Sequence, residues 1–157
     1  MIAEAGFLFA VTALNMSLAS LAGLVVAFRR SGSWAAYDLY RLRQIVEFGF
    51  ANALLSLALI PLSAMAGSVA SAVTIVAGVA IAYFVVYVLV LTRRWRAVAP
   101  GEFPVVVIGL DLVVILLLVA TIALDTVAVW EWALLALTAR PMIAFLLVLS
   151  TLRTEGG

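Results

Sequence analysis

A single arginine, Arg140, lies inside a long apolar segment and is followed directly by Pro141. A guanidinium at mid-membrane costs from about 3 to more than about 10 kcal/mol, so it must face protein or water. Pro141 cannot donate to the carbonyl of Leu137, so it is predicted to kink the helix at that point. Arg140 is therefore the first candidate for a functional group.

A carboxylate, Asp111, also lies in an apolar stretch, among valine and isoleucine side chains. Alone in such surroundings it would bind a proton, whereas a guanidinium partner would keep it ionised. Helical depths put Arg140 about 18 Å and Asp111 about 10 Å from the cytoplasmic ends of their helices. Because one arginine side chain spans about that difference, an Arg140–Asp111 ion pair is sterically feasible.

Three more polar side chains are expected at similar depths. Asn15 shares the middle layer with Arg140, whereas Asn52 and Tyr83 share an inner layer with Asp111. One interpretation is that these groups line a pathway for an ion, a proton or an anion. Another is a buried cluster that only fixes helix register, since buried pairs contribute specificity more securely than stability. A third, Arg140 reaching the lipid headgroups, is disfavoured by about 12 Å of apolar helix on its outer side.

Arg43 and Glu47 are one helical turn apart near the predicted cytoplasmic surface. Their spacing favours an interfacial ion pair. The alternative is that both charges belong to a cytoplasmic vestibule that leads into the pathway.

The composition excludes several kinds of chemistry. The chain has no histidine, cysteine or lysine, so the usual metal and haem ligands, thiol nucleophiles and Schiff-base lysines are all missing. We therefore expect no metal, no cofactor and no enzymatic activity. A net charge of +1 also speaks against nucleic acid as a partner.

The chain is 68% hydrophobic and only 11% charged, which is typical of a protein dissolved in lipid. Since a spanning helix needs about 20 apolar residues, we predict an all-α, polytopic membrane bundle of five helices in a single transmembrane domain, residues 1–157. The break between the second and third helices is predicted at the Pro, Gly and Ser residues of 61–68. The predicted spans are 5–28, 44–63, 68–92, 104–124 and 127–152.

The arginines predict the orientation of this bundle. Eight of them fall on one side of a five-span chain and none on the other, which places the N-terminus outside and the C-terminus in the cytoplasm. A short interfacial helix is expected at about 33–43, with its aromatic rings at headgroup level. Trp130 and Trp132 are expected to mark the opposite interface.

Small residues recur every four positions around Gly23 and Gly78, and such spacing predicts packing seams within the chain or between copies of it. Two functions remain open. The first is a homo-oligomeric channel or transporter in the plasma membrane, moving a small ion past Arg140 and Asp111. The second is a non-transporting accessory subunit of a larger membrane complex, in which the Arg140–Asp111 pair only fixes packing. In both cases the lipid bilayer is a partner.

Overall fold

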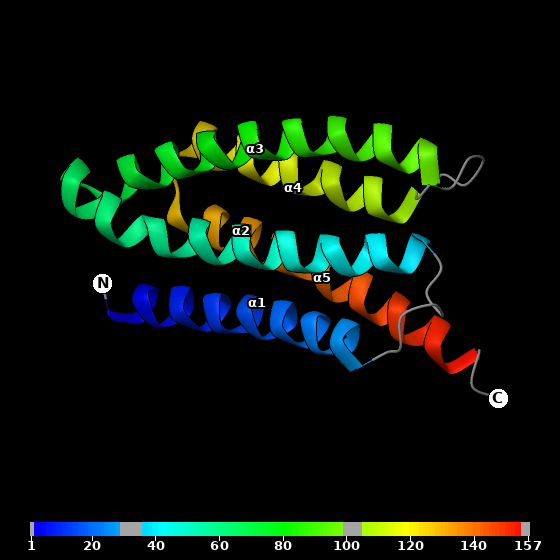
Figure 1. Ribbon diagram of the computed structural model, residues 1–157. Coiled ribbons are helices and arrows are strands. Elements are labelled where there is room, and N and C mark those ends of the chain that lie inside the picture. The colour runs from blue at the N-terminus through cyan, green and yellow to red at the C-terminus, as the bar shows by residue number, and fades with distance from the viewer. Residues whose placement is uncertain (1, 29–35, 99–104, 155–157) are drawn as a thin grey trace. The chain divides into compact units, whose positions relative to one another are not determined.

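The computed structural model describes residues 2–28, 36–98 and 105–154 (Figure 1). Within these ranges the chain forms five α-helices. They are α1 (Ile2–Phe28), α2 (Ala36–Ala66), α3 (Val69–Val98), α4 (Val105–Leu124) and α5 (Val127–Thr154).

Four of these helices are long and apolar enough to cross a bilayer. The qualifying segments are Ala5–Ala27, Leu39–Ala66, Val69–Val90 and Val127–Leu149. The apolar part of α4, Ile108–Leu124, is shorter. The chain is therefore an all-α, small multi-pass integral membrane protein.

The boundary between α2 and α3 differs from its prediction. Instead of ending near Ser63, α2 continues through Pro61 to Ala66. A proline removes one helical hydrogen bond, but leaving the helix in an apolar setting would expose many more backbone groups. The helix ends instead at Gly67, whose φ of +71° suits a residue without a side chain. Ser68 then caps α3, accepting a 3.1 Å hydrogen bond from the backbone N–H of Ser71.

The short helix predicted at about 33–43, leading into the second span, is continuous with that span in the structure, and its place at the membrane interface stays a prediction. From Ala36 onward its residues form the first turns of α2, without a break before the membrane-spanning part, and residues 33–35 lie outside the described ranges. No glycine or proline stands between Ala36 and Glu47, so nothing in the local sequence interrupts the helix.

The described helices divide into two compact units. The first comprises the residues up to Leu54 together with those from Thr138 onward, and the second runs from Leu55 to Leu137. The first unit therefore contains α1, the first part of α2 and the last part of α5. The second contains the end of α2, then α3 and α4, and the start of α5.

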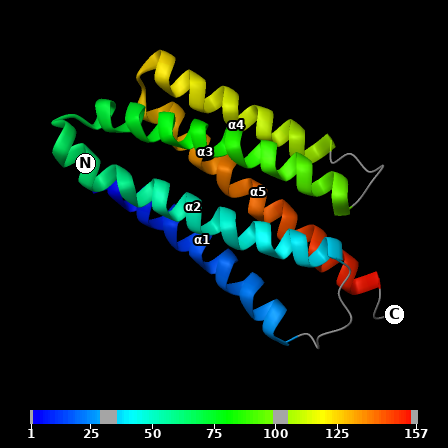
Figure 2. The same ribbon diagram turned by 45° about the horizontal axis from the view of Figure 1, so that its top comes forward.

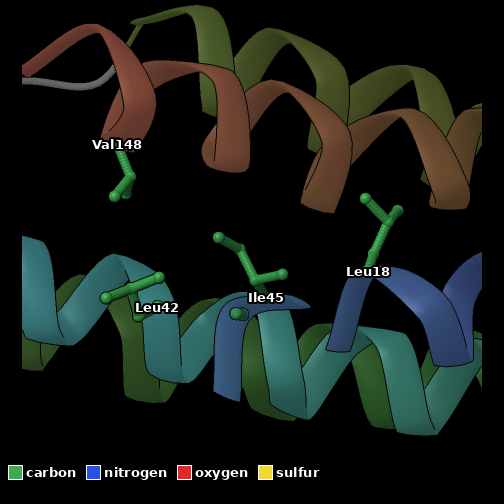
Figure 3. Close-up of a cluster of buried hydrophobic side chains, with 5 residues drawn as sticks. Leu18, Leu42, Ile45 and Val148 are labelled. Carbon is green, nitrogen blue, oxygen red and sulfur yellow. The ribbon is translucent and has the colours of Figure 1, made fainter. Parts of the chain in front are cut away.

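A small apolar core holds the first unit together. It comprises Leu18 and Ala22 of α1, Leu42 and Ile45 of α2, and Val148 of α5. Figure 3 shows Val148 pointing toward Leu42 and Ile45. Because this core joins the end of α1 to the start of α2 and the end of α5, α1 runs antiparallel to α2 and parallel to α5 in this unit (Figures 1 and 2).

In the second unit α3 and α4 lie side by side and antiparallel (Figure 2). Near the start of α3, the Thr74 hydroxyl donates a 3.3 Å hydrogen bond to Asp125 Oδ1 in the turn between α4 and α5. Asp125 has a φ of 49°, a conformation that aspartate tolerates better than most residues. The turn is short enough for α5 to begin at Val127, as predicted.

The structure describes two surfaces that were singled out from the sequence. Gly23 and Gly78 have nothing within 4 Å of where a Cβ would lie, so neither forms a seam within the described chain. Trp132 is 66% exposed, but Trp130 is fully buried and packs inside the protein. Contact of the two glycines with a second copy of the chain stays a prediction.

Candidate functional site

Asn15 is the centre of a buried polar cluster in the first unit. Its side chain is completely buried on α1. Its amide nitrogen donates one hydrogen bond to the Thr138 hydroxyl oxygen on α5 and another to the backbone carbonyl of Val11, each 2.9 Å long. Both amide hydrogens of Asn15 are therefore used within the protein.

Asn52 connects α2 to the same group. Its side chain is 1% exposed, and its amide nitrogen donates a 3.3 Å hydrogen bond to Asn15 Oδ1. Asn15, Asn52 and Thr138, called the amide cluster below, thus join α1, α2 and α5 by side-chain hydrogen bonds. Asn15 and Asn52, which were predicted to lie in different layers, therefore meet directly through their side-chain amides.

A glycine makes the close approach of α1 and α2 possible. A Cβ on Gly49 would lie 2.8 Å from the backbone oxygen of Asn15 and 3.0 Å from the Cβ of Ala19. The first distance is one that real Cβ atoms essentially never show and the second is tighter than most Cβ contacts, so a side chain here would require α1 or α2 to shift. Gly49 therefore allows α1 to lie close enough to α2 for Asn15 and Asn52 to meet.

Arg140 lies two residues beyond Thr138 and is only 4% exposed. Its guanidinium carbon is 3.9 Å from the centroid of the Phe48 ring, and that ring is itself 1% exposed. A desolvated cation over an aromatic face is a favourable arrangement. Phe48 is one turn from Asn52 on α2, so the guanidinium lies next to the amide cluster, on the side where α2 begins.

Asp111 and Tyr83 belong to the second unit. Asp111 is 3% exposed and continues a buried stripe of α4 that includes Val114, Leu118 and Thr121. On α3, the ring of Tyr83 stacks in a tilted arrangement on that of Tyr87, with centroids 6.0 Å apart. Since Arg140 and Asp111 belong to different units, their ion pair stays a prediction.

Arg43 and Glu47 form the ion pair that their spacing favours. Arg43 Nε donates to Glu47 Oε1 at 2.6 Å, and the two side chains are 62% and 36% exposed. An exposed pair of this kind contributes little to stability. Its role in a cytoplasmic vestibule stays a prediction.

Three residues of the site were not singled out from the sequence: Thr138, Phe48 and Gly49. The sequence of an apolar helix does not reveal which of its threonine or phenylalanine side chains meets a partner. The glycine at 49 carried some signal, because it lies one turn before Asn52 on the same apolar stretch. Pro141 is buried within a continuous α5, and its predicted kink stays a prediction.

The chemistry available to the cluster is limited. Carboxamides donate and accept hydrogen bonds but do not exchange protons readily, so Asn15 and Asn52 cannot form a proton wire. Arg140 supplies a permanent positive charge and several donors. No family model, no curated protein and no solved structure matches the chain. Its function is therefore inferred from these residues.

Proposed function

We propose that the protein is a non-enzymatic transport protein of the cell membrane, which moves a small ion past the fixed charge of Arg140. The observation that carries this proposal is a charged side chain, 4% exposed, within a candidate membrane span. The amide cluster already joins α1, α2 and α5 without Arg140. A costly charge is therefore kept where neutral hydrogen bonds already fix the packing of these helices.

The proposal includes five crossings, with the N-terminus outside. In the first unit α1 and α5 run in the same direction, so an odd number of crossings must separate them if both span the membrane. The candidate spans of α2 and α3 supply two. The 20 residues of α4 are about 30 Å long and would supply the third, because that length matches the hydrocarbon core.

The pathway is proposed to form in a homo-oligomer. Five helices enclose little space, so a pore would lie between subunits. The open faces at Gly23 and Gly78 support this arrangement because small residues let neighbouring helices approach closely.

A second candidate, a non-transporting accessory subunit, is favoured by one specific observation. Both hydrogens of the Asn15 amide are bound within the chain, so this amide offers no donor to a passing solute. A closed network of this kind suits a packing lock. In this case Arg140 would contribute to assembly with larger membrane proteins and would have no role in flux.

Flux from proteoliposomes separates the two candidates. Purified full-length protein would be reconstituted and loaded in turn with chloride, nitrate, potassium and sodium salts, with an ionophore to dissipate the membrane potential. The transport proposal predicts flux of at least one ion by the wild type. It also predicts a changed rate or selectivity in Arg140→Leu, while Arg43→Gln, which removes an exposed charge, behaves as the wild type.

The oligomeric state of each variant is measured in parallel. A wild type that carries none of these ions overturns the transport proposal. Loss of assembly in Arg140→Leu, with no wild-type flux, is the result expected of the accessory subunit.

A further inference from the structure

The aromatic ring of Phe48 is a buried platform for the guanidinium of Arg140. Phe48 is 1% exposed and Arg140 is 4% exposed, and the guanidinium carbon is 3.9 Å from the ring centroid. A separation this short suits a guanidinium plane that is stacked flat on an aromatic face. The cation therefore meets the ring on its face, where the negative part of the aromatic quadrupole lies.

An aromatic ring stabilises a guanidinium differently from a carboxylate. The ring adds no charge of its own, and a stacked ring binds none of the N–H groups, because these point outward in the guanidinium plane. The N–H groups stay directed at the partners that lie around the rim of that plane. A stacked ring thus fixes the plane in which Arg140 donates, and other groups can accept from it.

The amide cluster holds the two residues of this stack in register. Phe48 is one helical turn from Asn52 on α2, and Arg140 is two residues from Thr138 on α5. The Asn15 side chain is hydrogen-bonded to Thr138 at 2.9 Å and to Asn52 at 3.3 Å. An arginine side chain has many rotamers and loses much entropy when it is fixed in one of them. A ring held in place by the cluster is suited to select that rotamer.

We propose that Phe48 is the positioning residue for Arg140. Its ring holds the guanidinium plane in one orientation, and this orientation sets the direction in which the buried cation presents its donors to a passing ion. Holding the guanidinium is a property of the folded protein alone, whereas an effect of Phe48 on ion preference rests on the proposed function. The two are measured separately.

Fluorinated phenylalanines at position 48 test the stacking. Each added fluorine draws negative charge away from the ring face and changes the size of the ring little, so it weakens the attraction of a cation stepwise. The mono-, di- and trifluoro analogues would be incorporated into the full-length protein through an amber codon. The equilibrium constant for unfolding in mixed micelles is expected to rise with each fluorine, by up to about tenfold over the series.

Phe50 provides the matched control ring. It lies on the same helix two residues further along, but it is 48% exposed, whereas Phe48 is 1% exposed. The same analogues at position 50 should leave the unfolding constant nearly unchanged. If the series at 48 and at 50 have equal effects, Phe48 acts through packing alone and the proposal is wrong.

Arg140→Met is the control for the cation, because methionine keeps a long side chain without the charge. The fluorine series at position 48 should have no gradient in this background. A gradient that survives in Arg140→Met overturns the proposal, since the ring would then not act on the guanidinium. If Arg140→Met does not fold, the comparison of positions 48 and 50 decides.

Flux measurements on the same proteins distinguish this proposal from the transport proposal. Where the wild type carries an ion, the series at 48 should change the rate or selectivity stepwise. Unchanged flux beside a gradient in stability would overturn the effect of Phe48 on ion preference. A gradient without any flux supports the positioning of Arg140 and overturns the transport proposal. Flux without a gradient supports transport and overturns the positioning.

Discussion

Replacing Gly49 with alanine should lower the stability of the first unit, although the substitution adds only one methyl group. The added Cβ would lie 2.8 Å from the Asn15 carbonyl oxygen, whereas ordinary contacts begin at 3.4 Å. The difference, 3.4 − 2.8, requires the backbones of α1 and α2 to separate by about 0.6 Å. The hydrogen bond from Asn52 to Asn15 Oδ1 is already 3.3 Å long, so such a shift would break it.

The expected magnitude follows from opposing contributions. Alanine stabilises a helix interior by about 1 kcal/mol relative to glycine. Overpacking costs about 1–3 kcal/mol, and a lost interhelical hydrogen bond in a membrane protein costs about 0.6 kcal/mol. We therefore expect Gly49→Ala to lower the free energy of unfolding by about 1–2 kcal/mol.

Unfolding in mixed micelles with increasing denaturing detergent measures this free energy. Gly23→Ala and Gly78→Ala are matched controls, because nothing lies within 4 Å of either added Cβ. They should be neutral or more stable than the wild type, by up to about 1 kcal/mol. The reasoning about the α1–α2 contact is refuted if Gly49→Ala is as stable as these controls.

Two further predictions concern side-chain pairs. Thr138→Val removes the acceptor at 2.9 Å from the Asn15 amide and should cost about 1 kcal/mol. A double-mutant cycle with Asn15→Ala should give a coupling energy of about 0.6 kcal/mol, and a coupling near zero would contradict the observed bond. Glu47→Gln removes the exposed partner of Arg43 and should change the free energy of unfolding by no more than about 0.5 kcal/mol. A loss of several times this value in the same titration would show that the pair has a larger structural role.

The helices could largely be predicted from apolar length alone, because lipid requires nearly every backbone group to be bonded within its own helix. The same requirement explains the errors. Pro61 would interrupt a helix in water, yet here α2 continues through it. Only Gly67, with its positive φ, ends the helix.

The site was predictable in part. Asn15, Asn52 and Arg140 stood out because polar groups in an apolar segment must find partners. Thr138, Phe48 and Gly49 are ordinary residues for a membrane helix, and their roles depend on the rotation and register of the neighbouring helices. The burial of Trp130 also depends on the rotation of its helix, because a tryptophan near a helix end can face either lipid or protein.

Cysteine labelling from one side of the membrane tests most directly whether α4 crosses and Arg140 lies between the leaflets. The chain has no native cysteine, so single cysteines can replace Met65, Arg93 and Thr126, all of which are exposed. With an impermeant maleimide on intact cells, the account predicts labelling at 65 and 126, and labelling at 93 only after permeabilisation. Labelling of 126 together with 93 and apart from 65 would show that α4 does not cross, and would contradict the five-crossing arrangement.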